Sequence, residues 1–523
     1  IDSERKYAGT NRNARLQSFV FRHLARRKAT VRQAKASAYT KLEGHAMNIL
    51  VWLQRDLRLS DHAPLIEALA DADKVVLAYI HDPSHQIGEA NSVWLAHSLL
   101  DLQAKIQAKG GELVMCEGAF GDNFEQLLKA FSIDRVYYHF GVGAFFDRQQ
   151  QQALDICKHY KVVLKPYHQA WCPAEQIVTQ KGDYYSVFTP FYKKLTGLLN
   201  QVAYPLEAPK DLTKAAQKQA WSLPQSLQAL INKPWARKLM SNWQAGEHQA
   251  WSLFEHFVEQ DLNAYPQQRD FPAVSGTSKL SIALHFGEVS SRELLHRLQS
   301  LKTDPNLSLY AIDAFIRQLA WREFAHYLLA INPELETRPY QSKFENLSWQ
   351  DEPHLIQAWQ SGQTGIPIID AGMRELWHTG WMHNRVRMLV ASWLTKNANQ
   401  HWLHGQNWFA DTLFDADPAN NAMGWQWVAG CGVDAAPYYR LFNPVLQSEK
   451  FDPEAVYIKR WLPELQALPA SVCHAPWRFP IELAEHGLVL EQHYPAPKLD
   501  LDASRQDHLA RVGYLKQIPK SYT

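Results

Sequence analysis

Short apolar runs alternate with helical periodicity along the amino-terminal part of the chain. Five runs are nearly continuous in apolar residues and rich in β-branched or aromatic types: "NILVWL", "KVVLAYI", "GELVMC", "RVYYHF" and "KVVLKPY". Amphipathic patterns near residues 62–71, 91–109, 122–131 and 147–160 lie between them. Buried strands that alternate with helices pack as a parallel sheet with helices on both faces. The pattern predicts a doubly wound α/β domain over residues 47–172.

The strand pattern disappears after this domain. Residues 173–245 carry scattered prolines and the polar stretch "KDLTKAAQKQA", which indicates an interdomain connection with some helix. From residue 246 to 523 the chain reads as helices of ordinary length joined by Pro and Gly turns, so we expect an all-α domain. The run "GVGAFF" has no third glycine, and we interpret it as an ordinary strand-to-helix turn rather than a dinucleotide fingerprint.

Composition adds one asymmetry to this picture. Residues 1–46 hold 11 Lys and Arg against 3 Asp and Glu, a net charge of +8, whereas the whole chain has a net charge of +1. We interpret this segment as a leader outside the folded core. The alternatives are an Arg-rich targeting peptide and a basic arm that touches nucleic acid.

Two further features bound the class of protein. No stretch approaches the roughly 20 apolar residues of a membrane span, so we expect a cytoplasmic protein without a membrane partner. The five cysteines are scattered, with no Cys-x-x-Cys pair, which argues against a disulfide framework or a structural zinc. We therefore predict no metal.

The stretch "DADPANNAMGWQW" at residues 415–427 concentrates carboxylates, amides and indoles. Asp415 and Asp417 are candidate partners for a buried cation, because a buried charge requires one. On the segment "TGWMHNRVRMLVAS", Asn384, Arg387 and Met388 fall at helical positions i, i+3 and i+4, on one face. A surface Arg beside a core Met gives the same spacing.

Two other segments offer chemistry at helical spacing. In "AIDAFIRQLAWREFAHYLL", Gln318, Trp321 and Arg322 share one face, although a core Trp beside a surface Arg is an equal alternative. The segment "GTSKLS" places hydroxyls before a helix, where they suit phosphate oxygens or act as a plain N-cap. Together these features indicate a helical domain that binds a planar, phosphate-bearing cofactor beside an aromatic cleft.

The chain resembles the photolyase/cryptochrome flavoprotein family from Met47 to about Pro480. The resemblance rests on ordered motifs: "WLQRDLRLSDH", "YPQQRDFPAVSGTSKLS", "WREF", "TGIPIIDAGMRELWHTGWMHNRVRM", "DADPANN", "GWQW" and "DAAPYYRLFNPVLQSEKFDP". It implies an α/β domain followed by a helical domain that holds FAD, in agreement with the pattern above. It also implies light-driven repair of cyclobutane pyrimidine dimers by electron transfer from reduced FAD, as in the class I and class III photolyases.

The resemblance assigns roles to matching positions. Asn421 would face N5 of the flavin, and Arg387 would pair with Asp415. The other positions implied to hold FAD are Tyr265, Thr277, Ser278, Lys279, Leu280, Ser281, Arg322, Ala416 and Asp417. Electron transfer to the flavin would use Trp425, Trp402 and Trp349.

The positions implied for the substrate form a second set. Trp321 and Trp427 would stack on a flipped-out dimer, because enzymes that act on a base extrude it from the duplex, for which photolyases are themselves a standard example. Asn384, Met388 and Gln318 would contact the base edges. Arg269, Arg385, Arg440 and Gln447 would hold the DNA around the lesion. Gln318 stands where many relatives carry Glu, so this position has an amide in place of a carboxylate.

Sequence differences separate the branches of the family. Enzymes that repair (6-4) photoproducts carry histidines where Asn384 and Met388 stand here, and plant cryptochromes usually carry Asp at Asn384 and Asn421. The chain therefore favours a dimer-repair enzyme, acting as a monomer on UV-damaged DNA. The alternatives are a cryptochrome-like blue-light photoreceptor and a DNA-binding flavoprotein without repair.

The family often carries a second, light-harvesting cofactor, and we expect a folate, 5,10-methenyltetrahydrofolate. The segment "SVWLAHSLLDL" around Trp94 resembles folate-binding branches, and His85 lies near a pterin contact of some relatives. One feature argues against a folate: "GVGAFFDRQ" places Phe145 and Phe146 where folate-binding relatives are expected to carry an Asn-Glu pair. An empty pocket and a different chromophore are the alternatives.

Overall fold

The amino-terminal domain is built on a five-stranded parallel sheet, with strand order β3-β2-β1-β4-β5. The computed structural model describes residues 46–85, 88–435 and 437–517, so the basic segment expected to be a leader lies outside it except for Ala46. The chain enters at the central strand and winds outward in both directions, which confirms the doubly wound α/β domain. The strands are β1 (Asn48–Leu53), β2 (Lys74–His81), β3 (Leu113–Glu117), β4 (Arg135–His139) and β5 (Val163–Tyr167).

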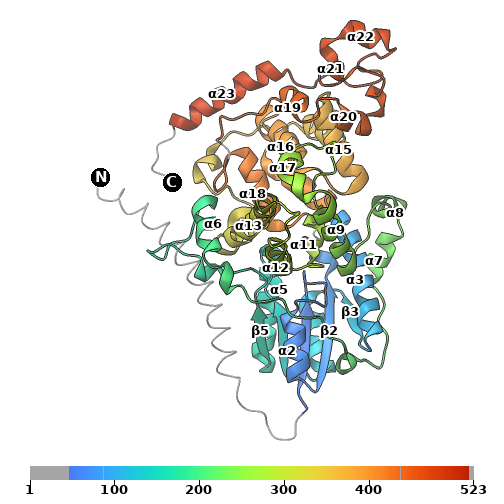
Figure 1. The fold of residues 1–523 in the computed structure, drawn as a ribbon, viewed down its shortest axis with the longest axis vertical. Helices are drawn as coiled ribbons and strands as arrows, with labels where there is room; N and C mark the ends of the chain where they lie inside the picture. The colour runs from blue at the N-terminus through green and yellow to red at the C-terminus, as the bar shows by residue number, and fades with distance from the viewer. Residues whose placement is uncertain (1–45, 86–87, 436, 518–523) are drawn as a thin grey trace.

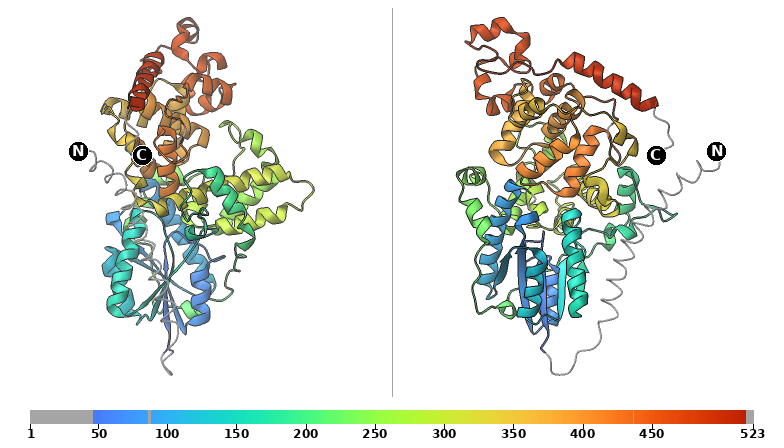
Figure 2. Two further views of the ribbon diagram at one scale, coloured as in Figure 1. Left: turned by 90° about the vertical axis from the view of Figure 1, so that its left-hand side faces the viewer. Right: turned by 180° about the vertical axis from the view of Figure 1, so that it is seen from behind.

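Helices cover both faces of this sheet, because alternate side chains of a strand point to opposite sides. On one face Ile49 and Val51 pack with α2 (Ala63–Asp71) and α3 (Glu89–Ala108). On the other face Leu50 and Trp52 pack with α4 (Phe120–Ala130) and α5 (Ala144–Tyr160). The left view of Figure 2 shows the sheet edge-on between its helices.

The connection after the sheet packs against both parts of the molecule. Phe188 and Phe191 of α6 are buried in a core of the helical region. Leu227 of α7 and Leu239 of α8 are buried in the core beside the sheet. The connection contains α6 (Phe188–Thr196), α7 (Gln225–Ile231), α8 (Pro234–Met240) and the 3-10 turns η2 (Ala174–Gln176), η3 (Leu199–Gln201) and η4 (Thr213–Ala215).

The rest of the chain is helical, as expected from the loss of the strand pattern, and it lies above the sheet domain in Figure 1. Among the described residues, no helix has both the length and the apolar character that crossing a membrane requires. The larger helices are α9 (Glu247–Gln260), α12 (Ser291–Leu301), α13 (Leu309–Ile331), α15 (Pro367–Thr379), α16 (Asn384–Ser392), α17 (Trp402–Thr412), α18 (Pro418–Ala429) and α23 (Leu501–Gln517). The shorter ones are α10 (Tyr265–Gln268), α11 (Ser281–Phe286), α14 (Pro353–Gln360), the π-helix η8 (Trp393–Asn397), α19 (Pro444–Phe451), α20 (Val456–Trp461), α21 (Ala470–Cys473) and α22 (Pro480–Glu485); 3-10 turns are η1 (Pro83–His85), η5 (Leu262–Ala264), η6 (Pro333–Glu336), η7 (Ser342–Asn346), η9 (Pro463–Leu465) and η10 (Pro476–Arg478).

The sheet domain and the helical region share one tightly packed joint. The Trp94 ring packs on Phe286 and Phe414, and its indole N–H donates to Glu288 over 2.9 Å. Gly287 ends α11 with a φ of +69°, and a Cβ there would lie 2.1 Å from the carbonyl oxygen of Arg55. Only glycine permits this backbone conformation and this close approach. Trp94 is thus a core residue of the joint.

Candidate functional site

The segment "GTSKLS" forms a strained loop in front of α11. Lys279 has a φ of 54°, a left-handed conformation that non-glycine residues rarely adopt. Its ammonium group lies 5.5 Å from the ring centre of Trp381 and 5.8 Å from that of Trp243. Thr277 and Ser278 are half-buried and Ser281 is exposed at the first position of α11. The loop therefore presents hydroxyls beside a cation, a composition that suits phosphate.

An ion pair between α16 and the segment before α18 has one open acceptor. Arg387 donates through Nη2 to Oδ2 of Asp415 over 2.9 Å, and through Nε to the carbonyl of Met382 over 2.8 Å. Asp415 is buried, yet its Oδ1 has no hydrogen-bond partner within the described chain. Because buried acceptors are almost always paired, this oxygen is placed to receive a donor from a bound group. The predicted pairing of Arg387 with Asp415 is present.

Asp417 lies close to this ion pair and contacts histidine side chains. His326 Nε2 is 3.1 Å from Asp417 Oδ2, and His326 Nδ1 donates to the carbonyl of Arg322 over 2.9 Å. Burial opposes ionisation of Asp417, but His326, His285 and Arg322 lower its pKa well below the usual range. His326 thus links the backbone of α13 to the carboxylate of Asp417.

Asp417 and His326 line a cleft between the sheet domain and the helical region, whereas Arg387 and Asp415 are not among its lining residues. Its polar lining includes Arg55, His168, His285, Arg322, His326 and Asp417. Arg322 donates to the carbonyl of Leu284 over 3.1 Å. Helical spacing places Arg322 with Gln318 and Trp321, but the three side chains contact different neighbours.

Asn421 stands on α18 with a defined amide orientation. Its Nδ2 donates to the carbonyl of Gln406 over 3.0 Å. A carbonyl accepts only, so the amide nitrogen faces Gln406 and the Oδ1 atom is the end left for a ligand. The half-buried side chain is thus set to accept a hydrogen bond.

Trp321 and Gln318 contact different parts of the chain. Phe188 stacks on one face of Trp321, with ring centres 3.6 Å apart and planes at 7°. Gln318 Oε1 accepts from Arg269 Nη2 over 3.1 Å. Asn384 is exposed at the start of α16, while Met388 and Trp427 are half-buried beside the same core. The helices that carry these residues, α13, α16 and α18, pack on one another through α18.

The expected DNA-binding residues have different surroundings. Arg385 forms an ion pair with Asp270 at 2.9 Å and lies 4.3 Å from the ring centre of Phe451. Arg269 lies next to Asp270 in the chain, so the two arginines are near each other. Arg440 is exposed, Gln447 is half-buried, and both follow α18.

Two of the three expected electron-transfer tryptophans are buried, and the third is partly exposed. Trp425 and Trp402 are buried, whereas Trp349 is half-buried. The Trp425 ring fills the place of a side chain at Gly405, three residues after Trp402 on α17, since a Cβ there would lie 1.9 Å from the ring. The His401 ring lies 5.5 Å from Trp402 and 5.2 Å from Trp349. Rings in contact thus lead from Trp402 to the surface.

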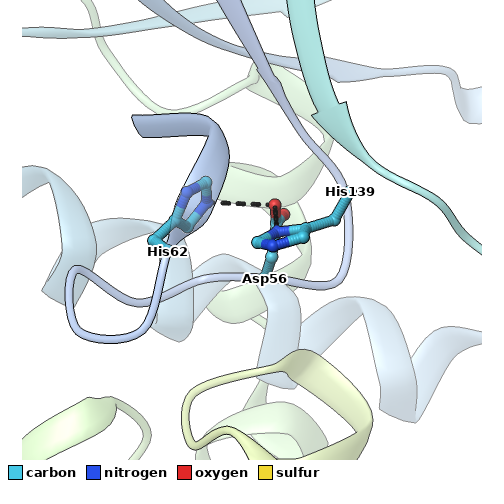
Figure 3. Close-up of side chains that lie close together, drawn as sticks. All are labelled: Asp56, His62 and His139. Atoms are coloured by element: carbon cyan, nitrogen blue, oxygen red, sulfur yellow. Dashed lines mark hydrogen bonds and ion pairs between the residues drawn. The ribbon is translucent and has the colours of Figure 1, made fainter. Parts of the chain in front are cut away.

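A buried cluster of Asp56, His62 and His139 lies at the carboxyl ends of β1 and β4 (Figure 3). Asp56 Oδ2 is 3.0 Å from His62 Nε2 and 2.8 Å from His139 Nδ1. Burial opposes ionisation of Asp56, but the two histidines hold its pKa below the usual range. Leu65 donates its N–H to His62 Nδ1 over 3.2 Å, so Nε2 must carry the proton that faces Asp56. A metal would displace that proton, so the cluster fits a hydrogen-bond network better than a metal site.

Two family models match this chain. Residues 49–230 match "DNA photolyase", and residues 315–513 match "FAD binding domain of DNA photolyase". A deoxyribodipyrimidine photo-lyase from Agrobacterium fabrum is 36% identical over 482 residues, which cover 90% of this chain and 98% of the relative. The chain belongs to the DNA photolyase family.

Solved structures of photolyases and their relatives share the fold. A bacterial class III photolyase from Agrobacterium tumefaciens is 35% identical with a TM-score of 0.85, covering 92% of this chain and all of that one (100%). A cryptochrome from Synechocystis is 28% identical with a TM-score of 0.82, covering 89% and 99%. The photo-lyase names and the class III structure support dimer repair over the cryptochrome-like alternative. The photolyase family model also supports FAD as the cofactor and damaged DNA as the partner.

Several residues of this photolyase site carry no signal in the sequence. Phe188 lies in the connection, far from Trp321 in the sequence. A helical pattern does not indicate which distant aromatic residue packs against Trp321. The His326 and Asp417 pair also joins distant segments. His401 is adjacent to Trp402 in the sequence, so a contact between these two side chains was predictable.

Proposed function

We propose that the protein splits cyclobutane pyrimidine dimers in DNA with light and reduced FAD. The observation that carries the proposal is the arrangement on α13, α16 and α18. α13 carries an indole backed by Phe188, and Arg387 of α16 pairs with a carboxylate just before α18 whose second oxygen has no partner among the described residues. When bound and reduced, FAD supplies on illumination the electron that opens the cyclobutane ring and takes it back, so no net redox change occurs.

The FAD-binding role is proposed for the residues around the strained loop and the ion pair. Asp415 Oδ1 accepts a hydrogen bond from the flavin ring, and Arg387 keeps that carboxylate ionised and oriented. Asn421 offers Oδ1 to N5 of the flavin. The phosphates and ribityl chain lie against the loop and its neighbours: Tyr265, Thr277, Ser278, Lys279, Leu280, Ser281, Arg322, Ala416 and Asp417.

A second set of residues would hold the dimer. Trp321 and Trp427 stack on the extruded bases, while Asn384, Met388 and Gln318 contact their edges. Gln318 already accepts from Arg269, so its amide N–H group remains for a thymine carbonyl. Arg269, Arg385, Arg440 and Gln447 contact the phosphates, and for Arg385 this contact competes with Asp270.

Trp425, Trp402 and Trp349 are proposed to carry electrons from the surface to the flavin. The support is the burial of Trp425 and Trp402 and the ring contacts through His401 that join Trp402 to the partly exposed Trp349. This route brings the flavin to the reduced state that repair requires.

A light-harvesting folate is proposed for the sheet domain. A pocket lies at the carboxyl ends of β1 and β2, lined by Gln54, Arg55, His81 and Asn91 together with Phe145 and Phe146. Gln54 is buried, and neither polar atom of its amide has a partner in the described chain. A side-chain amide with an unpaired donor and an unpaired acceptor complements the lactam edge of a pterin. Reconstitution with the folate should add its near-UV absorption band, and Gln54→Leu should abolish that gain.

The proposed partners are UV-damaged DNA and no second protein chain. The enzyme is expected to act as a monomer in the bacterial cytoplasm, associated with the nucleoid while it is bound to DNA.

The deciding experiment uses photoreduced protein and an oligonucleotide that contains one thymine dimer. Blue light should restore thymine absorbance, and a dark control should not. Tight binding with no recovery in light would refute repair and favour a photoreceptor. A reduced flavin that is stable in the dark, with many turnovers per enzyme, would separate repair from signalling in the same samples.

A further inference from the structure

The loop between α18 and α19 presents two exposed side chains beside a buried anchor. Tyr439 is 59% exposed and Arg440 is exposed, whereas the neighbouring Tyr438 is buried. The Tyr438 ring packs between Phe344, at 5.2 Å, and His508, at 4.7 Å. Among the described residues, Arg440 makes no ion pair with an acid. It is therefore free to meet a phosphate.

The last described helix, α23, holds this anchor. Ser504, His508 and Arg511 follow one another at helical spacing and share one face of α23. His508 is fully buried and donates through Nε2 to the carbonyl of Tyr438 over 2.7 Å. Asn397 donates to Ser504 Oγ over 2.9 Å, and Arg511 donates to the carbonyl of Lys396 over 2.7 Å. The helix thus contacts both the loop and the π-helix η8.

The π-helix η8 binds a second carbonyl of the loop, that of Arg440. Lys396 is fully buried, and its ammonium donates to the carbonyl of Arg440 over 2.7 Å. A π-turn shifts side-chain direction relative to an α-helix and is frequent at functional sites. Burial of a lysine costs free energy. A buried lysine that donates to one backbone carbonyl therefore indicates that the conformation of this loop is required.

The two carbonyls are fixed on either side of Tyr439. Because the backbone oxygens of residues 438 and 440 are both bonded to the protein interior, rotation of the backbone between them is restrained. The side chains of Tyr439 and Arg440 are then directed outward. This contact pattern fixes a binding loop from behind, through residues that do not face the ligand.

We propose that His508 of α23 and Lys396 of η8 are positioning residues that hold Arg440 in the orientation that binds a DNA phosphate next to the dimer. The inference rests on the proposed function in dimer repair. It adds that DNA affinity depends on a helix whose contacts with the loop are made from the protein interior.

The test compares three variants of the full-length, FAD-loaded protein. His508→Phe keeps the ring and removes the N–H donor, Arg440→Gln removes the phosphate contact, and Gln506→Met is the control on the exposed side of α23. Binding to a dimer-containing duplex is measured by fluorescence anisotropy over a range of salt concentrations. FAD content and the rate of photoreduction are measured on the same samples.

We expect His508→Phe and Arg440→Gln each to weaken binding about tenfold, because one charge-assisted contact is lost. Each should also lower the slope of log Kd against log salt by about one phosphate contact. The double variant should bind no worse than Arg440→Gln, since both changes remove the same contact. FAD content and photoreduction should stay at the wild-type level, as should binding by Gln506→Met.

Unchanged affinity in His508→Phe, or additive losses in the double variant, would overturn the inference. If His508→Phe does not retain FAD, Lys396→Met and Arg511→Gln apply the same test to the other two contacts. Wild-type protein that shows no preference for dimer DNA over undamaged DNA would instead refute the proposed function.

Discussion

Phe188 and Trp321 form a parallel ring stack with centres 3.6 Å apart, although the two residues come from different parts of the chain. Phe188 begins α6 in the connection, and the guanidinium of Arg317 lies 4.9 Å from its ring centre. The stack covers one face of Trp321 and fixes the plane of the indole. In the proposed function, a base of the dimer stacks on the other face. The connection thus contributes to the proposed substrate site.

Phe188→Leu should weaken binding of dimer DNA several-fold and reduce repair, because Trp321 loses the ring that fixes its plane. The cost to stability should be about 1 kcal/mol, the size of one aromatic pair. Anisotropy and thermal melts check both numbers. Tyr192→Leu is the matched control, since Tyr192 stacks on Phe188 but not on Trp321. An equal effect of the two variants on DNA binding would contradict this prediction.

Asp415→Asn should strongly reduce the amount of FAD that copurifies, because the change leaves the Arg387 guanidinium without its anion and removes the proposed flavin acceptor. Loss of the charged acceptor should also cost about 1 to 3 kcal/mol of stability, since Arg387 is partly exposed. Flavin absorbance per protein measures the loss of FAD. Asp313→Asn, which removes one partner of an exposed pair with Lys302, should leave FAD content unchanged.

Trp402→Phe should slow photoreduction of the flavin to a small fraction of the wild-type rate, because a phenyl ring is far harder to oxidise than an indole. Repair by protein that has been reduced chemically should continue. Trp408→Phe on the same helix provides the control, since Trp408 stacks on the exposed Trp377 and lies outside the proposed chain. Loss of repair in chemically reduced Trp402→Phe would assign Trp402 a different role.

Stability should fall between pH 5 and pH 8 through Glu375. Burial raises the pKa of Glu375 from 4.5 to about 7, so the folded protein favours the protonated form. The stabilisation is complete below the unfolded pKa and is lost as pH rises through the folded pKa. Glu375→Gln should therefore match the wild type at pH 5 and exceed its free energy of unfolding by about 2 to 3 kcal/mol at pH 8. Urea titrations at both pH values measure this difference, and the exposed Glu485→Gln should behave as the wild type does.

Treatment with a chelator should leave the melting temperature unchanged if Asp56, His62 and His139 form a hydrogen-bond network. Asp56→Asn should destabilise the protein by about 3 kcal/mol, because both histidines lose a charged acceptor. A melting temperature that falls on chelation and recovers with added zinc would show that the cluster holds metal.

The fold was predictable because the local patterns agree with the tertiary structure. All five strand predictions coincide with β1 to β5, since strands buried on both faces are continuous apolar runs. The pairing of Arg387 with Asp415 was expected from resemblance, and the contact is present at 2.9 Å. Phe188, His508 and Lys396 were not predicted, because their contacts join segments whose proximity is set only by packing. Trp94 suggested a ligand site, but it is buried at the joint. Its indole N–H donates to Glu288 there, so a core position also explains an indole beside polar residues.

The joint around Trp94 also limits how this protein can be divided. Phe286 and Phe414, from the helical region, are members of the same buried cluster as Ile49 and Val51 of the sheet. Separation of the halves would expose that cluster to water, because residues of the helical region complete the core on this face of the sheet. The boundary between the two matched family regions is therefore a boundary in sequence but not in folding. A fragment cut there should aggregate, and insertions or deletions at the joint should be tolerated less well than those in surface loops.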